Sequence, residues 1–582
     1  MATRRTQAVL TLAALLCASR LAPAPQTETV VDIGSPGGRL VIALRSEPKT
    51  LNPVTSVDAP SRDVIGRMVG RLVTINRDTL RTEPGLARSW QVSRDGRRYV
   101  LELRPGLRFS DGHPLDADDV VFSLQAYLDE RNGSPQRELL IVGGKPIVAR
   151  RLGPTTVGFE LAEPYAAAER LFDGIAILPR HLLGRAQEQG KLAEAWGLDT
   201  PPVELAGLGP FRLKSYVPGQ RVVLERNPHY WKTDRSGQHL PYLDELTFLI
   251  TPSDDAQVVR FQSGETDLIN RLAAENFDVL TREQAARGYR LRDLGPGLEY
   301  AFLLFNLNPG LEARGLAAVA RRQDWFRDVR FRQAVSAAID RPAVARLAYR
   351  GRATPLGSHV TPANRPWVNT ALKPPQPSAD RSRALLASAG FSWDAEGALV
   401  DSARHRVEFS MIVNAANSAR VQSATIIADD LGAVGMRVAI VPLENRALID
   451  RVLQTYDYDT ALMALGGGDA DPNSEMNVWT SAGKTHLWHL GQTRPATPWE
   501  SEIDELMRRQ LVTLDTRARK RLYDRVQELV AENAPIVPLV SPNILVGAKD
   551  GLANFRPSIL DHYTLWNADE LFWRQRAAAQ RP

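Results

Sequence analysis

Buried strands and amphipathic helices alternate along most of the chain. Unbroken apolar runs within 38–44 and 300–306 are typical of strands buried on both faces. Residues 99–103 alternate apolar and polar side chains, which predicts a half-exposed strand. Further strands are predicted over 222–225, 246–250 and 438–441.

Helices are predicted between these strands from apolar spacing and from their starting residues. Asp116 is placed to cap a helix over 116–128, whose first turn contains Asp118 and Asp119, as the helix dipole favours. Ser253 is placed to cap a second helix that reaches Phe261. Further helices are predicted over 64–72, 328–339 and 420–431. This alternation predicts an α/β architecture.

Length and charge narrow the class of protein. A chain of 582 residues exceeds the roughly 250–300 residues that one core usually serves, so several domains are expected. The formal net charge is +5, but like charges never run five in a row. Because nucleic-acid binding needs a concentrated basic patch, we expect no nucleic-acid partner.

The N-terminus has the pattern of an export signal. Arg4 and Arg5 precede an apolar run over 8–18, and small residues follow up to position 24. The run is shorter than the roughly 20 apolar residues that a membrane helix needs. We therefore predict a secretory signal over 1–26 and a periplasmic mature protein, with a buried helix of the fold as the alternative.

The only cysteine, Cys17, lies inside this predicted signal. A lipoprotein signal would place small residues directly before it, whereas Leu15 and Leu16 stand there. Cleavage beyond Cys17 and a mature chain without disulfides are therefore expected. A lipid anchor at Cys17 is the alternative.

Four groups of residues occur in a characteristic order along the chain. The groups are Glu83–Trp90 with Leu101–Gly112 and Ala117–Val120, then Gly207–Leu213 with Leu224–Trp231, then Gly264–Asp267, then Phe326–Ala334 with Ala338–Arg341. Together they resemble the signature stretches of solute-binding family 5, the dipeptide-, oligopeptide- and nickel-binding components of bacterial ABC importers. The resemblance extends from about residue 38 to about residue 545.

The resemblance implies an α/β, periplasmic-binding-protein-like fold. Two lobes joined by two crossovers would close on a ligand by hinge motion, and an extra α/β domain would be attached. The implied parts are the signal over 1–26, the start of lobe I over 27–56, the extra domain over 57–165, lobe I over 166–285, lobe II over 286–540 and a return to lobe I over 541–582.

The resemblance also implies where the ligand binds. In peptide-binding relatives an aspartate of lobe II takes the α-amino group of the ligand. The matching position here is Asp469 when the preceding glycine–aspartate step is aligned, and Gly468 when Asp471 and the following proline are aligned. Further ligand-binding candidates by position are Val57, Asp58, Ala59, Asp471, Trp479, Ser481 and Trp488.

Several of these candidates have a second interpretation. Asp58 is suited to cap a helix that begins at Ala59. Trp479 and Trp488 are equally suited to a hydrophobic core. His486 and His489 are three residues apart without a third ligand, so no metal site is predicted.

We predict a solute-binding protein without a cofactor that is not an enzyme. It would act as a monomer, capture a peptide or similar small solute, and deliver it to a permease and ATPase complex in the inner membrane. One alternative is a secreted serine hydrolase, because Ser481 and Lys484 have serine-x-x-lysine spacing. Another is the same fold with a non-peptide ligand, such as an oligosaccharide or a metal chelate.

Overall fold

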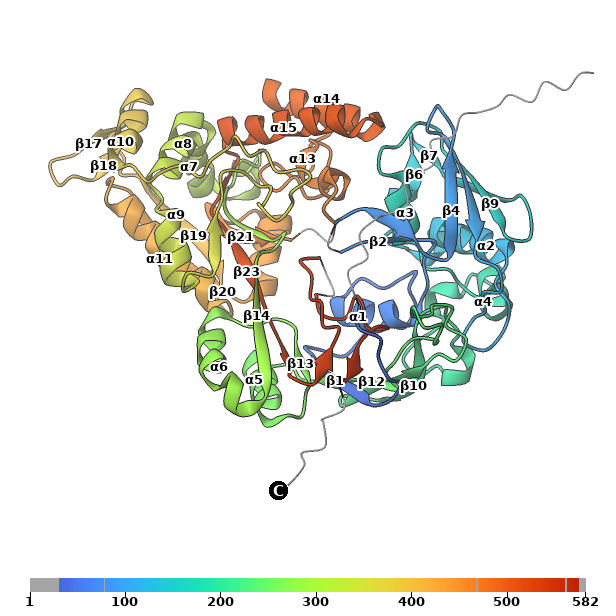
Figure 1. Cartoon of the computed structure of the whole chain (residues 1–582). Helices are drawn as coiled ribbons and strands as arrows, with labels where there is room; N and C mark the ends of the chain where they lie inside the picture. Colours follow the sequence, from blue (N-terminus) through green and yellow to red (C-terminus); the bar gives the residue numbers. More distant parts are fainter. Residues whose placement is uncertain (1–30, 78, 467–468, 561–562, 575–582) are drawn as a thin grey trace, which may run out of the picture.

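The computed structural model describes residues 31–77, 79–466, 469–560 and 563–574. The predicted signal over 1–26, Cys17 and the candidate Gly468 lie outside the described residues. The described chain is organised around three large sheets, with lobe I at the bottom of Figure 1, lobe II at the upper left and an N-terminal domain at the right.

Lobe I is built on a sheet whose strands come from distant parts of the chain. Their order is β10-β11-β12-β1-β13-β23-β14, with β16 paired to β23. The strands are β1 (Arg39–Leu44), β10 (Phe211–Val217), β11 (Arg221–Arg226), β12 (Glu245–Ile250), β13 (Leu268–Ile269), β14 (Tyr289–Pro296), β16 (Ala353–Pro355) and β23 (Val540–Lys549). β1 runs parallel to β12 and β13 at the centre, which explains its continuous apolar sequence.

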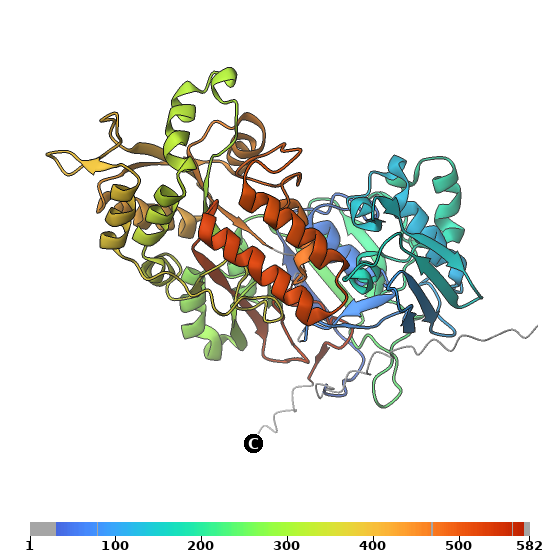
Figure 2. The same cartoon turned by 90° about the horizontal axis from the view of Figure 1, so that it is seen from above.

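Lobe II is built on a second sheet of order β20-β19-β21-β15-β22. Its strands are β15 (Tyr300–Phe305), β19 (Glu408–Asn414), β20 (Arg437–Leu443), β21 (Thr460–Leu465) and β22 (Ile536–Pro538). All six residues of β15 are buried, as the apolar run predicted. Helices around this sheet include α7 (Ala317–Arg327), α8 (Val329–Ala338), α10 (Ala379–Ser388), α11 (Ser418–Gly432), α14 (Pro498–Val512) and α15 (Thr516–Asn533). Figure 2 shows α14 and α15 packed side by side.

The N-terminal domain contains the third sheet, of order β4-β5-β9-β8. Its elements include β4 (Ala87–Val92), β5 (Arg98–Leu103), α2 (Ala117–Leu128), β8 (Val148–Arg151), β9 (Thr156–Glu160), α3 (Ala168–Gly174) and α4 (Arg180–Glu188). Phe172 of α3 contacts the rings of Tyr99 and Phe159 on this sheet, with ring centroids 5.8 and 4.6 Å away. α3 therefore packs as part of this domain, although it lies beyond the predicted boundary at 165.

The chain crosses between the two lobe sheets at positions where two segments are hydrogen-bonded to each other. Residues 297–299 connect β14 to β15, and Leu539 connects β22 back to β23. The amide of Gly297 donates to the carbonyl of Pro542 at 3.1 Å, and the amide of Leu539 donates to the carbonyl of Ala301 at 2.8 Å. Because β14 pairs with β23, lobe I extends to Pro296, beyond the predicted boundary at 286.

Local sequence signals account for the starts of several helices. Asp58 caps α1 (Ala59–Met68), since its carboxylate accepts from the amide of Ser61 at 2.9 Å. Asp116 forms a capping box with Asp119 at the start of α2. Ser253 caps α5 (Asp254–Ser263). These caps confirm the predicted helix starts at 116 and 253, whereas the helix predicted over 64–72 begins earlier and ends at Met68.

Candidate ligand-binding cleft

An interlobe cleft contains a cavity of about 780 Å³ that adjoins one of about 350 Å³. Both cavities are lined by Arg45, Arg271, Glu299 and Tyr563. Lobe I contributes the end of β1, the start of α5 and the segment around Arg271, while lobe II contributes the segments near Glu299, Arg350 and Asn414. These volumes lie in the usual range for small-molecule sites, roughly 300–1,000 Å³.

The lobe I wall of the cleft presents positive charges held by neighbours. Arg45 follows β1 and forms an ion pair with Asp254 at 2.6 Å. Arg271 donates to the hydroxyl of Tyr563 at 2.8 Å, and its guanidinium lies 5.2 Å from the centroid of that ring. These contacts position both guanidinium groups at the cleft.

The lobe II wall presents an acid on the crossover itself. Glu299 accepts from the Nη2 of Arg420 at 3.2 Å and lines both cavities. Arg350 lines the larger cavity from a turn in which its φ is +51°, a left-handed conformation uncommon for a residue with a side chain. The cleft therefore offers charges of both signs from both lobes.

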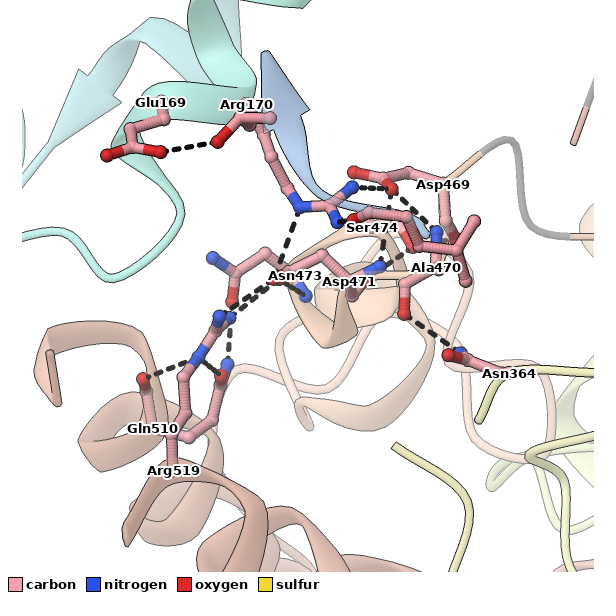
Figure 3. A network of polar contacts seen from close by, with 12 residues as sticks. Glu169, Arg170, Asn364, Asp469, Ala470, Asp471, Asn473, Ser474, Gln510 and Arg519 are labelled. Carbon is pink, nitrogen blue, oxygen red and sulfur yellow. Dashed lines mark hydrogen bonds and ion pairs between the residues drawn. The ribbon is translucent and has the colours of Figure 1, made fainter. Parts of the chain in front are cut away.

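The predicted amine-binding residue Asp469 is engaged by an arginine of the N-terminal domain. Figure 3 shows Arg170 extending from α3 to Asp469, with which its Nη1 forms an ion pair. The same guanidinium donates to the carbonyl of Leu80. Burial raises the pKa of Asp469, and the charge of Arg170 opposes part of that rise. Asp469 lies at an edge of the interlobe space, and it does not line the two larger cavities.

The neighbouring candidate Asp471 is a structural residue of lobe II. Its two carboxylate oxygens accept from Arg519 of α15 at 2.6 and 2.7 Å. Arg519 also donates to the side chain of Gln510 at 2.8 Å. The side chains of Asp471 and Arg519 are only 5% and 6% exposed, so this bidentate pair is closed to a ligand.

The N-terminal candidates lie near the cleft in different ways. Ala59 lines the cavity of about 350 Å³, together with Arg62 and Asp63 of the same helix. Asp58 serves as the helix cap described above, and the side chain of Val57 is exposed. Of these candidates, the structure places Ala59 on the cavity wall.

Three downstream candidates are core residues in this structure, which corrects their prediction as cleft residues. Trp479, Ser481 and Trp488 are each 1% exposed. The indole N–H of Trp479 donates to Glu475 at 2.8 Å, and that of Trp488 donates to Glu500 at 3.1 Å. Their aromatic side chains offer a large apolar surface, and in this structure that surface packs within the hydrophobic core of lobe II.

The environment of Ser481 does not resemble that of an activated nucleophile. Its hydroxyl is buried and has no hydrogen-bond partner among the described residues, while Lys484 is exposed. Nucleophilic serines require a base within hydrogen-bond reach.

Glu475 is a third acid in the same loop, half-buried in lobe II. It accepts from Trp479 at 2.8 Å and from the hydroxyl of Tyr523 at 3.5 Å. Burial raises the pKa of Glu475 to about 7, and these two hydrogen bonds partly oppose the rise. This carboxyl group therefore titrates near neutrality.

His486 is buried in lobe II and bonds to protein groups on both ring nitrogens. Its Nδ1 lies 3.0 Å from the carbonyl of Val478, and its Nε2 lies 3.3 Å from Glu500. Across the described ranges, histidine, cysteine and acidic side chains nowhere gather in threes or more as a metal site would require. In the same ranges, every helix is too short or too polar to span a bilayer.

Several cleft residues were missed from the sequence. Glu299 follows Gly295, Pro296 and Gly297 and precedes a buried strand. That glycine–proline–glycine run marks a break between two strands, so it could have indicated a crossover lined by Glu299. Arg45, Arg170 and Arg271 carry no comparable local signal, because their roles depend on partners that are distant in sequence.

Two α/β lobes that enclose a charged cleft and are joined by adjacent crossovers define a solute-binding protein. The family model for the middle part of the bacterial extracellular solute-binding proteins, family 5, matches residues 81–486. That match spans well over half of the chain. The chain belongs to the bacterial extracellular solute-binding proteins of family 5, which confirms the predicted resemblance and fold class.

Similar proteins match most of the length of this chain. It is 26% identical over 520 residues to a probable ABC transporter-binding protein of Deinococcus radiodurans, with 85% of each chain covered. It is 24% identical over 530 residues to the oligopeptide-binding protein AppA of Bacillus subtilis, with 89% of each chain covered.

Solved structures share the fold. The substrate-binding protein CtaP of Listeria monocytogenes superimposes with a TM-score of 0.76 at 21% identity, covering 93% of this chain and 100% of CtaP. AppA of Bacillus subtilis, in complex with a nonapeptide, superimposes with a TM-score of 0.70 at 22% identity, again covering 93% and 100%.

Proposed function

We propose that this protein captures a peptide or peptide-like solute in the interlobe cleft and delivers it, in the periplasm, to the permease of an ABC importer. The observation that carries the proposal is the pair of adjoining cavities lined from both lobes by Arg45, Arg271 and Glu299. The names of the relatives support it, since one is a probable ABC transporter-binding protein and another is an oligopeptide-binding protein.

The charges of the cleft suit a zwitterionic solute. A peptide carries an ammonium group, a carboxylate and a repeating set of backbone donors and acceptors. Arginines on both walls can receive a carboxylate through paired N–H groups. Glu299 supplies an acid on the cavity wall, and Ala59 supplies a small surface beside it. We assign Glu299, Arg45 and Arg271 as the principal polar contacts of the ligand.

We further propose that the solute leaves unchanged. The buried position of Ser481 supports binding without turnover, because a hydrolase would need this hydroxyl at the cleft and beside a base. Incubating the protein with a bound peptide and recovering it intact by mass spectrometry is the expected outcome. Cleavage that is lost in Ser481→Ala would support the hydrolase alternative.

The proposed binding is tested by identifying the solute that copurifies with the protein and then adding candidate solutes to the ligand-free protein. Solutes that copurify with the full chain would be identified by native mass spectrometry. The chain would then be unfolded, refolded without ligand and screened by thermal shift against pools of two- to nine-residue peptides, oligosaccharides and metal chelates. A peptide at 100 times its Kd should add about 2.7 kcal/mol of stability.

A matched pair of variants locates the site. Glu299→Gln removes the charge of a lobe II glutamate paired with Arg420, and Glu408→Gln does the same for a glutamate 3.6 Å from Arg437 on the surface of lobe II. We expect peptide affinity to fall at least tenfold in Glu299→Gln and to stay unchanged in Glu408→Gln. Stabilisation by oligosaccharides or chelates, with none by peptides, would contradict the peptide assignment.

A further inference from the structure

The pair formed by Arg170 and Asp469 joins two separate parts of the molecule, the N-terminal domain and lobe II. Arg170 belongs to α3 of the N-terminal domain, and Asp469 belongs to lobe II, 299 positions later in the chain. Figure 3 shows the guanidinium entering the lobe II loop from the side of α3. The contact therefore ties the N-terminal domain to lobe II in this arrangement of the chain.

Neighbouring groups hold the guanidinium of Arg170 at this position. It donates to the carbonyl of Leu80, at the tip of the hairpin formed by β2 (Val73–Ile75) and β3 (Thr82–Pro84). Leu80 has a φ of +59° and packs in a cluster with Leu298 of the crossover and Ala470 of lobe II. This apolar contact across the domains holds the hairpin carbonyl where it accepts from Arg170.

Of the two aspartates in this loop, Asp469 makes the closer contact with Arg170. Asp471 already accepts two hydrogen bonds from Arg519, and its ion pair with the Nε of Arg170 is longer, at 3.8 Å. Asp469 forms an ion pair with Arg170 and accepts a hydrogen bond from the amide of Ala470 at 2.6 Å. An internal cation thus occupies the carboxylate where an external cation could otherwise bind.

The pair remains within reach of a solute. The side chains of Arg170 and Asp469 are 16% and 26% exposed, and both line a cavity of about 220 Å³ between the N-terminal domain and lobe II. Leu298 borders both the small pocket at Asp469 and the 350 Å³ cavity that contains Glu299. A solute in the cleft could therefore approach Asp469 if Arg170 did not occupy it.

We propose that Arg170 is a specificity-determining residue, whose guanidinium substitutes for a ligand ammonium group at Asp469. The cleft then selects solutes without requiring a free amine at this carboxylate. This inference rests on the proposed binding function. A tethered cation competes at an effective concentration in the millimolar range or above, so an ammonium group at micromolar concentration does not displace it.

The inference is tested first with a probe that is independent of the natural ligand. L-alaninamide carries an α-ammonium group, and N-acetyl-L-alaninamide lacks it. Binding of each would be measured by calorimetry at low salt to the full-length wild type, Arg170→Gln, Arg170→Lys and the double variant Arg170→Gln/Asp469→Asn. Arg151→Gln is the matched control, because it removes an arginine paired with Asp118 within the N-terminal domain.

We expect Arg170→Gln to bind L-alaninamide at least tenfold more tightly than the wild type. Arg170→Lys and Arg151→Gln should behave as the wild type, since a cation remains at Asp469. The double variant should bind L-alaninamide no more tightly than the wild type. N-acetyl-L-alaninamide should bind the wild type and Arg170→Gln with equal affinity. Equal binding of L-alaninamide by wild type and Arg170→Gln, at any level, would overturn the inference.

A second arm applies the inference to peptides. The same chains would be immobilised and exposed to a tryptic peptide pool, either untreated or N-acetylated, and retained peptides would be quantified by mass spectrometry. The wild type should retain both forms within about threefold, and Arg170→Gln should favour free amines at least tenfold. A tenfold preference of the wild type for free amines that disappears in Asp469→Asn would overturn the inference.

The two arms separate the inference from the function on which it rests. If neither the wild type nor any variant retains peptides, while Arg170→Gln still binds L-alaninamide more tightly than the wild type, the peptide assignment fails and the role of Arg170 stands. If peptides bind, but Arg170→Gln binds L-alaninamide no more tightly than the wild type, the proposed function stands and the role of Arg170 is overturned.

Discussion

Asp469 and Asp471 lie two positions apart in one loop, and each pairs with an arginine. The main partner of Asp471 is Arg519 of the same lobe, through two short hydrogen bonds in a buried site, while the Nε of Arg170 lies 3.8 Å from its carboxylate. The partner of Asp469 is Arg170 of another domain, at a site that adjoins a cavity. The same chemistry therefore stabilises the interior of lobe II at one position and joins two domains at the other.

The difference shows that the identity of a residue does not decide whether it serves the fold or the ligand. An aspartate whose main counter-ion is buried in its own lobe is part of the packing of that lobe. An aspartate whose counter-ion belongs to another domain, beside a cavity, can exchange that partner without disrupting the packing of its own lobe.

Asp471→Ala should be the most destabilising change in the loop. It leaves the guanidinium of Arg519 buried and unpaired, which typically costs about 3–5 kcal/mol. Asp469→Ala should cost about 1 kcal/mol, because its pair is partly exposed. Urea unfolding of both variants measures the difference. Arg519→Met added to Asp471→Ala should restore much of the loss, and equal costs for the two alanine variants would contradict the contrast.

Glu475 extends the comparison to an acid whose described partners are neutral. Its folded pKa of about 7 is above the ordinary value of 4.5, so its stabilising contribution is complete below pH 4.5 and is lost as pH rises through 7. Glu475→Gln keeps the hydrogen bonds and removes the charge. Relative to this variant, the wild type should lose about 3 kcal/mol of unfolding free energy from pH 4.5 to above pH 7.

Unfolding free energies at pH 5 and pH 8 measure this dependence. Glu502→Gln, on the exposed face of α14, is the control and should follow the wild type at both values. Parallel pH profiles of the wild type and Glu475→Gln would show that burial does not perturb this carboxyl group.

The smallest effect is expected from the coupling between Arg170 and Asp469. A double-mutant cycle with Arg170→Gln and Asp469→Asn should give a coupling free energy of about 1 kcal/mol, which weakens as salt rises. A matched cycle with Arg151→Gln and Asp118→Asn measures an ion pair inside one domain. A larger coupling in the control cycle would contradict an interlobe pair that contributes to closure.

The sequence predicted those features that local patterns control. The strand at 38–44 and the cap at Asp116 depend on neighbours within a few residues, and both are observed. The family resemblance left the amine-binding position open between Asp469 and Gly468 and made Asp471 a further candidate. The sequence could not predict how Asp469 and Asp471 differ, because their arginine partners lie 299 and 48 positions away. Trp479 and Trp488 show the same limit, since a large apolar side chain suits either a core or a binding surface.

The position of Glu299 has a mechanical consequence. This residue lies on the short link between the two sheets, where the link is hydrogen-bonded to the returning strand. A solute bound there would act close to the axis about which the lobes turn. A rotation about such a link moves the far rims of the lobes more than the link itself. The protein could thus report an occupied cleft to a membrane partner that touches only its outer edges.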